Sequence, residues 1–500
     1  MKNKFKQNTR VVLSVAFVYV MGFGMSNVNA ANEKVAVSST ASSAAAYNCA
    51  ADSKWFSNPS MPVEVKQSGS DGSSTFCDFY QFSWQTFAYL MAQSKNDPKL
   101  RNFADIKQYY ELEVNADGSP ANSCDDKHDS YTFFIRTSKP RAGGTEFVIP
   151  ERIGQAGGGA TIYDQNGNVV YYDVRFSKNM CDVNGIKQQN NFPGGTTELK
   201  IAWKVLGKGD DASKFITLDA KIGSGSATTK LGLIGFHVAV ATPDHPEFVW
   251  ATLEHAVNSP NCTAPSTTTG WSFASPSCTA SLQSKTPCTF NNATKQTTTT
   301  GKPTEICREY PYGSAEGDLK YAENVGDITS LNANVRPYLT GSYAVLTNYF
   351  NVGALWVSDI TQSSIIAGQT GVAQISNQRG SLRLANTVAE TEFQNVDPAS
   401  TFVSNCFGCH NYTGTSIPAA GKNTTSGNLS HIFDDIAAGS GQCLDVQAAS
   451  LINNQQQAVA SCPKTCVGFS SPFVWNGQWT NQDAKTGQQL PMTVCGCCGK

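Results

Sequence analysis

Cysteine is the residue that most constrains what this chain can fold into. Sixteen of its 500 residues are cysteine, a number that fits disulfides in an oxidising compartment better than free thiols in a reducing one. The N-terminus predicts the oxidising compartment. Basic residues between positions 2 and 10 precede an apolar run to Met25, and small residues follow up to Ala30, the order of a secretory signal peptide. We therefore expect a signal peptide over residues 1–30, export to the periplasm or the cell surface, and disulfides for most cysteines.

Composition excludes several classes of protein. Charged residues make up 15% of the chain and the formal net charge is −2, so we expect no basic surface that could hold nucleic acid by neutralising phosphates. No later apolar run has the roughly 18 residues that a membrane-spanning helix needs, so we expect no transmembrane segment. A hydrophobic content of 40% is enough for a buried core.

The pattern of the first 400 residues predicts an α+β fold. After a flexible leader over residues 31–48, large apolar residues fall at helical spacing over 80–91 and again over 339–350. Between them, short β-type runs alternate with turn residues. The Asn166-Gly167 pair predicts a hairpin that joins residues 160–163 to 169–176. We expect a β-rich main domain over residues 49–400 with flanking helices.

A second predicted hairpin joins residues 231–242 to 247–255 and brings three histidines and Glu254 into one region. Symmetric pairing about the four-residue turn places His237 opposite Thr252, so His237 and His255 point to opposite faces of the sheet. We therefore expect ordinary packing for these histidines. A metal site and a haem-facing histidine are the alternatives.

An insertion over residues 262–307 has its own character. It is rich in serine, threonine and proline, which cannot build a core. It also contains Cys262, Cys278, Cys288 and Cys307. We expect disulfides to stabilise it.

Residues 406–410 read C-x-x-C-H, the attachment pattern for c-type haem. Cys406 and Cys409 are spaced to form thioethers with the two vinyl groups, and His410 follows them to coordinate the iron. His431 could supply the second axial ligand, with a solvated loop histidine or ligation by Met492 as alternatives. The two cysteines could also form a disulfide or half of a zinc site. We expect a haem c attachment segment over residues 401–440.

Several motifs on the N-terminal side of this segment support the same interpretation. Residues 82–87 (FSWQTF), 243–246 (PDHP) and 249–255 (VWATLEH), together with the C-x-x-C-H run, resemble a poorly characterised family of exported bacterial cytochrome-c-like proteins. The resemblance covers residues 76–431. It implies haem on Cys406, Cys409 and His410, but it brings no established reaction.

The last 55 or so residues form a separate module. Asn453 and Asn454 can cap a short helix over residues 455–461, which Pro463 would end. Disulfides are expected to link one group of cysteines to another: Cys443, Cys462 and Cys466 to Cys495, Cys497 and Cys498. Trp475 and Trp479 flank Asn-Gly-Gln, which suits a sugar: aromatic faces pack on the apolar side of a pyranose, and amides bond its hydroxyls. The alternative is that both tryptophans are simply core.

This module resembles one unit of the mannan-binding lectin family, whose cyanobacterial members bind oligomannose. The resemblance is carried by the Cys-Pro-Lys-Thr-Cys run at 462–466, by Trp-Asn-Gly-Gln-Trp-Thr, and by Met-Thr-Val-Cys-Gly-Cys at 492–497. It implies a small antiparallel sheet with one helix over residues 446–500. Carried onto this sequence, the glycan site consists of Trp475, Asn476, Gly477, Gln478, Trp479 and Thr480.

Together these features predict an exported haem c protein that transfers electrons to a redox protein partner and binds mannose-type glycans through its C-terminal module. We expect a binding and electron-transfer protein rather than an enzyme. Two alternatives remain open: a haem-dependent oxidoreductase or peroxidase directed to polysaccharide, and a structural glycan-binding surface protein without haem.

Overall fold

The computed structural model describes part of the chain. The described residues are 47–105, 107–111, 160–180, 191–221, 228–262, 266, 268–283, 293–294, 300–318, 320–357, 378–389, 406, 429–430, 443–469, 474–482 and 489–498. The predicted signal peptide and most of the predicted leader lie outside them.

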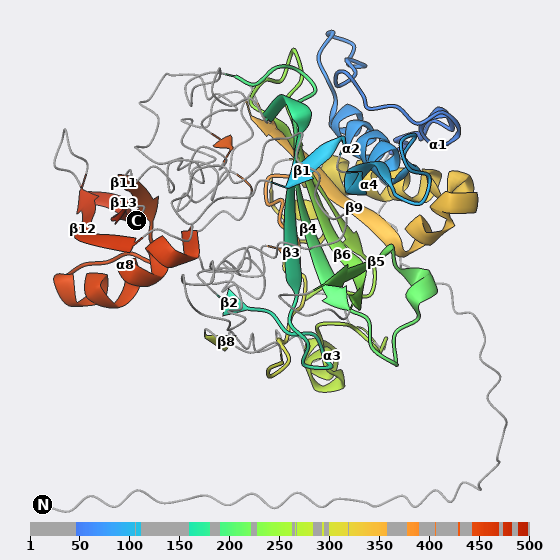
Figure 1. Ribbon diagram of the computed structural model, residues 1–500. Helices are drawn as coiled ribbons and strands as arrows, with labels where there is room; N and C mark the ends of the chain where they lie inside the picture. Colours follow the sequence, from blue (N-terminus) through green and yellow to red (C-terminus); the bar gives the residue numbers. More distant parts are fainter. Residues whose placement is uncertain are drawn as a thin grey trace, which may run out of the picture. The chain divides into compact units, whose positions relative to one another are not determined.

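The predicted α+β class is confirmed, and its centre is an eight-stranded antiparallel sheet (Figure 1). The strands are β1 (Tyr109–Glu111), β3 (Tyr171–Ser177), β4 (Thr197–Val205), β5 (Thr217–Lys221), β6 (Thr228–Val240), β7 (Val249–His255), β9 (Tyr349–Val357) and β10 (Gln378–Gly380). Their order is β1-β3-β4-β6-β7-β9-β10, with β5 paired to β6. The long strand β6 therefore pairs with β5 along its first part and with β7 along its second.

Helices pack on one face of this sheet. Helix α2 (Phe76–Met91) lies beside α4 (Tyr321–Asn334) in Figure 1, and α1 (Lys54–Ser57) precedes them. The ring of Phe87 on α2 contacts Phe236 on β6 at a centroid distance of 5.5 Å. The helix begins with a capping box, in which Thr75 and Asp78 satisfy each other's backbone donors. Burial of its apolar residues against the sheet explains why the predicted helical stripe forms here.

Short helices connect these elements. They are α3 (Pro276–Gln283) and the 3-10 helices η1 (Asn102–Ala104), η3 (Lys178–Met180), η5 (Ala212–Lys214), η6 (Pro311–Gly313), η7 (Arg336–Tyr338) and η8 (Gly341–Asn348). Strands β2 (Ala160–Thr161) and β8 (Ala293–Thr294) form a separate two-stranded pair.

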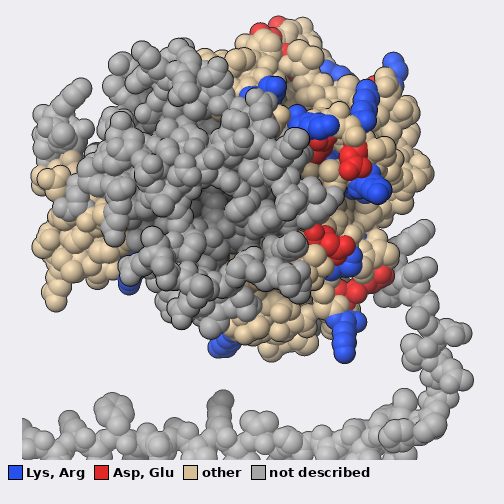
Figure 2. All heavy atoms as spheres, in the orientation of Figure 1, with Lys and Arg blue, Asp and Glu red and all other residues tan. Residues whose placement is uncertain are grey.

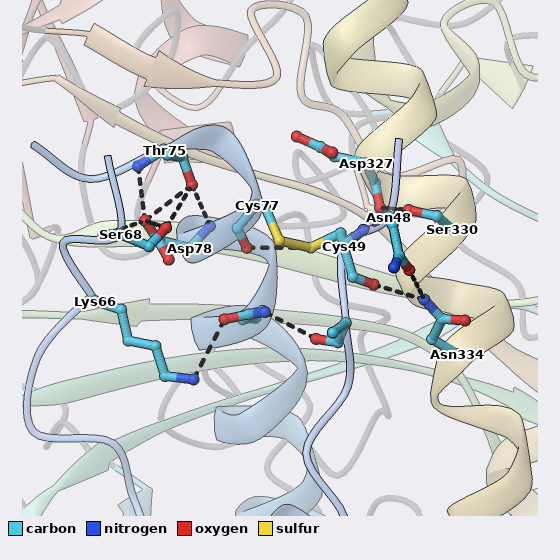
Figure 3. The surroundings of a disulfide bond; sticks show 12 residues. Asn48, Cys49, Lys66, Ser68, Thr75, Cys77, Asp78, Asp327, Ser330 and Asn334 are labelled. Atoms are coloured by element: carbon cyan, nitrogen blue, oxygen red, sulfur yellow. Dashed lines mark hydrogen bonds between the residues drawn. A yellow bond between two sulfur atoms is a disulfide. The ribbon is translucent and has the colours of Figure 1, made fainter. Parts of the chain in front are cut away.

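A disulfide between Cys49 and Cys77 ties the start of the described chain to helix α2 (Figure 3). The backbone around Cys49 is also held by α4, because its N–H donates to the Ser330 hydroxyl and its carbonyl accepts from the Asn334 amide. The chain before α1 is thus fastened to both helices that cover the sheet.

The opposite face of the sheet has its own apolar cluster. At the end of β6, Val238 and Val240 belong to the helix-covered core, whereas Ala239 and the next residue after the strand, Ala241, belong to this second cluster. Alternate residues of a strand point to opposite faces, so the two clusters lie on the two sides of the sheet. Leu429 is part of the second cluster.

Both predicted hairpins are confirmed. Tyr163 bridges Val169 across the Asn166-Gly167 turn, and Gly167 has a φ of 78°, the positive value that glycine tolerates. In the second hairpin, His237 pairs with Thr252 as predicted from the turn length.

The predicted helix over residues 339–350 is confirmed only in part, because the run is a 3-10 helix that ends at Asn348. Tyr343 and Leu346 are buried as the spacing implies, but they lie on the 3-10 helix η8, and the chain enters strand β9 at Tyr349. The aromatic and aliphatic residues from Tyr349 to Val357 pair with β7 and β10. Pairing in the sheet therefore decides the conformation of this run over its helical spacing.

The insertion is closed by a disulfide between Cys262 and Cys307, and Cys278 is disulfide-bonded as well. These cysteines, together with Ala274 and Leu282, form a small apolar cluster of their own. The prediction that disulfides stabilise this segment is confirmed for these residues.

The described surface mixes charges of both signs. On the face drawn in Figure 2, lysines and arginines lie among aspartates and glutamates. None of the helices in the described part of the chain is both long and apolar enough to cross a membrane.

The C-terminal module contains a three-stranded antiparallel sheet and one helix. Strand β13 (Gln489–Cys498) is central, between β11 (Cys443–Gln447) and β12 (Val474–Gln482), and the helix is α8 (Gln455–Phe469). This is the architecture that the resemblance to mannan-binding lectins implies. Its core is a separate cluster.

Candidate functional site

Two disulfides join helix α8 to the central strand of the C-terminal module. They link Cys462 to Cys495 and Cys466 to Cys497. Residues four apart on a helix lie on one face about 6 Å apart, and residues two apart on a strand lie on one face at about 6.6 Å. Because the two spacings match, both bridges can form side by side. The predicted linkage between these groups of cysteines is confirmed.

The remaining cysteines of the predicted group lie at the end of the sheet. Cys443 and Cys498 are directly paired residues of β11 and β13. Their side chains lie outside the described residues, so a bridge between them stays a prediction.

Helix α8 starts as predicted but ends later. The Asn454 side chain accepts from the backbone N–H of Gln457 at 2.9 Å, which caps the first turn. Pro463 lies inside the helix, which continues to Phe469, so the prediction that this proline ends it is wrong. Proline removes one backbone donor and strains the turn before it, but disulfides hold the helix at Cys462, just before the proline, and at Cys466, just after it.

Both candidate tryptophans lie on the strand face that carries these disulfides. Trp475 pairs with Cys497 and Trp479 with Cys495, and both indoles pack against the cluster that contains the cysteines. They remain partly exposed. The tryptophans are therefore both part of the module's core and accessible at its surface, which combines the two interpretations of the sequence.

Between the two tryptophans, strand β12 bulges away from its partner. Three residues, Asn476, Gly477 and Gln478, stand opposite the single residue Gly496. Gly477 has a φ of 90°, and a Cβ added there would meet no atom within 4 Å. Gly477 and Gln478 are exposed. The bulge thus presents main chain to solvent beside two aromatic rings.

The two indole N–H groups are bonded in different ways. Trp475 Nε1 donates to the main-chain oxygen of Gln478 at 2.7 Å, which closes the bulge on itself. Trp479 Nε1 donates to Oε1 of Gln455, the first residue of α8, also at 2.7 Å. One ring is fixed by its own strand and the other by the helix.

Thr480, the last residue of the predicted site, and its neighbour Asn481 lie on the same strand. Thr480 is exposed, and its hydroxyl accepts from the backbone N–H of Gln482 at 3.0 Å. Asn481 donates to the carbonyl of Ile452 at 2.9 Å, which fixes the strand to the segment before α8. Strand β12 carries no ionisable side chain, so its chemistry is that of stacking and neutral hydrogen bonds. The side chain of Asn476 lies outside the described residues.

Sequence reasoning missed Gln455. It is one of three consecutive glutamines and lies 24 residues before the tryptophan it contacts. Its predicted place at the helix start does not by itself indicate a role in the glycan site. Only the packing of α8 beside β12 brings the two side chains together.

The histidines of the second hairpin have separate partners. His245 Nδ1 lies 2.7 Å from Oε1 of Glu64. His255 Nε2 lies 3.0 Å from the carbonyl of Lys214, and its Nδ1 accepts from the N–H of Val257. These contacts define the neutral tautomer with the proton on Nε2. Burial is the main cause that lowers the pKa of His255 to about 4.

Glu254 is bonded in another direction. It is fully buried and accepts from Arg308 at 2.7 Å and from the backbone N–H and hydroxyl of Thr387. Within the described part of the chain, no group of three or more histidine, cysteine, aspartate or glutamate side chains is arranged to hold a metal. The contacts of His245, His255 and Glu254 are those of ordinary packing.

Of the predicted haem residues, only Cys406 is described. It is half-buried and packs against the second apolar cluster of the main sheet. Leu429 belongs to the same cluster. The hydroxyl of the next residue, Ser430, donates to Glu198 at 3.0 Å. Cys409, His410 and His431 lie outside the described residues.

One comparison with known proteins finds a similarity in the C-terminal module. Residues 455–497 match the family model for mannan-binding protein. No curated protein matches the chain, and no solved structure matches it.

The matched residues coincide with the elements described above. They begin at the first residue of α8 and extend to the second of the two bridged cysteines on β13. The match therefore contains both disulfides, both tryptophans and the bulge. It supports the resemblance of this module to mannan-binding lectins, and it does not reach the main sheet.

Proposed function

We propose that the C-terminal module binds mannose-type glycans at the surface formed by Trp475, Trp479 and the bulge between them. The observation that carries this proposal is the match of residues 455–497 to the mannan-binding protein family. The geometry agrees with it, because two partly exposed indoles flank main chain that a ligand can approach. Aromatic faces contact the apolar side of a sugar ring, and exposed amides bond its hydroxyls.

The test is surface plasmon resonance of the intact chain on immobilised mannan. Truncation of a central aromatic contact at a hot spot costs about 2 kcal/mol or more, so Trp475→Ala should weaken binding at least about thirtyfold. Because Trp475 also closes the bulge, Thr480→Ala serves as a second variant that leaves both indole contacts in place. Trp271→Ala, on the insertion, is the matched control and should bind as the wild type does. Unchanged binding in both site variants would contradict the proposal.

We further propose that the chain carries haem c, with thioethers at Cys406 and Cys409, iron ligation by His410, and His431 as the second axial ligand. The support is the C-x-x-C-H sequence. Cys406 packs against an apolar cluster, a setting that suits the edge of a porphyrin. Haem bound there would supply one-electron transfer to a redox protein partner.

Export to the periplasm or cell surface completes the proposal. It is supported by the order of residues 1–30, and by four disulfides in which both cysteines are described, since disulfides are typical of an oxidising compartment. Attachment of c-type haem in bacteria belongs to the same compartment.

A further inference from the structure

We infer that Gln455 is a positioning residue of the proposed glycan site, because it fixes the orientation of the Trp479 ring. This inference rests on the proposed function of the module. Gln455 is the first residue of α8, and Trp479 lies on β12, so their contact is a link between the helix and the strand that carries the bulge.

The chemistry of the two groups determines how the amide is oriented. An indole N–H can only donate, so the atom of Gln455 that lies 2.7 Å from Trp479 Nε1 must be the carbonyl oxygen. The amide NH₂ then points away from the indole. Gln455 is exposed, so this hydrogen bond, rather than burial, holds its side chain in place.

The neighbouring glutamines do not share this role. Gln457 accepts from the backbone N–H of Asn453 at 2.8 Å and belongs to the cap of the helix. Gln456 is exposed on the same turn. Among the three glutamines, Gln455 is therefore the one that reaches the aromatic platform.

Fixing the ring matters because Trp479 is only partly buried. A partly exposed indole can rotate about its side-chain torsions, and a ligand that stacks on it must then order it on binding. A ring already held by Gln455 avoids this cost, as does any preorganised site. Trp475 obtains the same benefit within its own strand, through Gln478.

The experiment measures the affinity of the intact chain for immobilised mannan in single variants and in one double variant. Loss of the acceptor in Gln455→Ala should weaken binding about fivefold to tenfold. Gln455→Glu keeps an acceptor oxygen and should bind within about twofold of wild type. A negative side chain is also favourable at the start of a helix. Gln456→Ala is the matched control and should not change the affinity.

Trp479→Phe supplies the decisive comparison, because it keeps an aromatic ring but has no N–H. Adding Gln455→Ala to Trp479→Phe should cause no further loss, since the contact is already absent. Two results would overturn the inference while mannan binding by the wild type remained. One is that Gln455→Ala weakens binding as much in the Trp479→Phe protein as in the wild type, and the other is that Gln455→Ala alone keeps wild-type affinity. Absence of mannan binding in the wild type would overturn both.

Discussion

At the scale of single residues, the C-terminal module depends on what each indole N–H bonds. Trp475 and Trp479 were expected to share a role from the sequence, and they do share one face of β12. What the sequence could not provide was the partner of each. Trp475 bonds a carbonyl three residues away, whereas Trp479 bonds a side chain on another element. The contact of Trp479 depends on how the helix packs against the sheet, and the spacing of nearby residues does not encode that packing.

The bond from Trp475 to Gln478 predicts a modest effect on stability. Trp475→Phe keeps most of the aromatic surface but leaves the bulge without this bond, which should lower the free energy of unfolding of the module by about 1 kcal/mol. Thermal unfolding followed by near-ultraviolet circular dichroism measures this change. Trp271→Phe removes a comparable bond, from Trp271 Nε1 to the carbonyl of Thr268 in the insertion, and is the control for location: it should leave the unfolding of the C-terminal module unchanged. Wild-type stability of the module in Trp475→Phe would contradict the assignment.

His255 makes the stability of the main sheet depend on pH. Its pKa is about 4 in the folded chain and about 6.5 when unfolded. The folded state therefore favours the neutral imidazole. The contribution of His255 to the free energy of unfolding is fully present above about pH 6.5 and is lost as the pH falls towards about 4. The total is about 3 kcal/mol.

Urea unfolding of wild type and His255→Gln between pH 4 and pH 7 measures this contribution. The glutamine amide can still donate to the carbonyl of Lys214, but it does not titrate. We expect the difference between the two proteins to shrink steadily as the pH falls. A difference that stays constant over this range would show that His255 does not titrate as described.

At the scale of elements, regular patterns were predicted well and junctions poorly. The register of β6 on β7 follows from counting residues about a four-residue turn, and His237 lies opposite Thr252 as that count requires. The end of helix α8 was missed, because Pro463 is a strong local signal and the disulfides that hold the helix on both sides of it are long-range links. Likewise, η8 gives way to β9 because the sheet offers strand partners.

The paired disulfides predict a specific loss. Replacing Cys466 and Cys497 together by serine frees the helix after Pro463. The two cysteines have a sequence separation of 31, and loss of their bridge should cost about 2–4 kcal/mol of module stability. Mannan binding should weaken with it, because the affected strand pairs with β12. The control replaces Cys262 and Cys307, which should leave mannan binding unchanged. If the variant without the Cys466–Cys497 disulfide were as stable as the wild type, the stabilising role of this disulfide would be contradicted.

At the scale of the whole molecule, the C-terminal module, the main sheet and the C-x-x-C-H segment were predicted from different features of the sequence. The C-terminal fold was predictable through the resemblance to mannan-binding lectins, which short cysteine and tryptophan motifs carry. The eight-stranded sheet was predictable only as a class, since its order places β9 beside β7 across about a hundred residues, and no local signal encodes such a pairing. The proposal of a haem segment rests on a motif of five residues, C-x-x-C-H.

Haem attachment is tested on the intact chain produced in a host that matures c-type cytochromes. We expect a Soret band that remains with the polypeptide after denaturation, and six-coordinate low-spin iron on reduction if His431 completes the site. Cys406→Ala should remove at least one thioether and shift the reduced spectrum. A colourless protein with Cys406 and Cys409 joined in a disulfide would contradict the proposal.

The central claim is that the C-terminal module confers recognition of mannose-type glycans on the molecule. A glycan array probed with the intact, oxidised chain tests it most directly, because the array offers mannose-type structures beside unrelated sugars in one measurement. The account predicts binding confined to mannose-type glycans and displaced by soluble mannan. Binding to none of them, or equal binding to glycans without mannose, would contradict it.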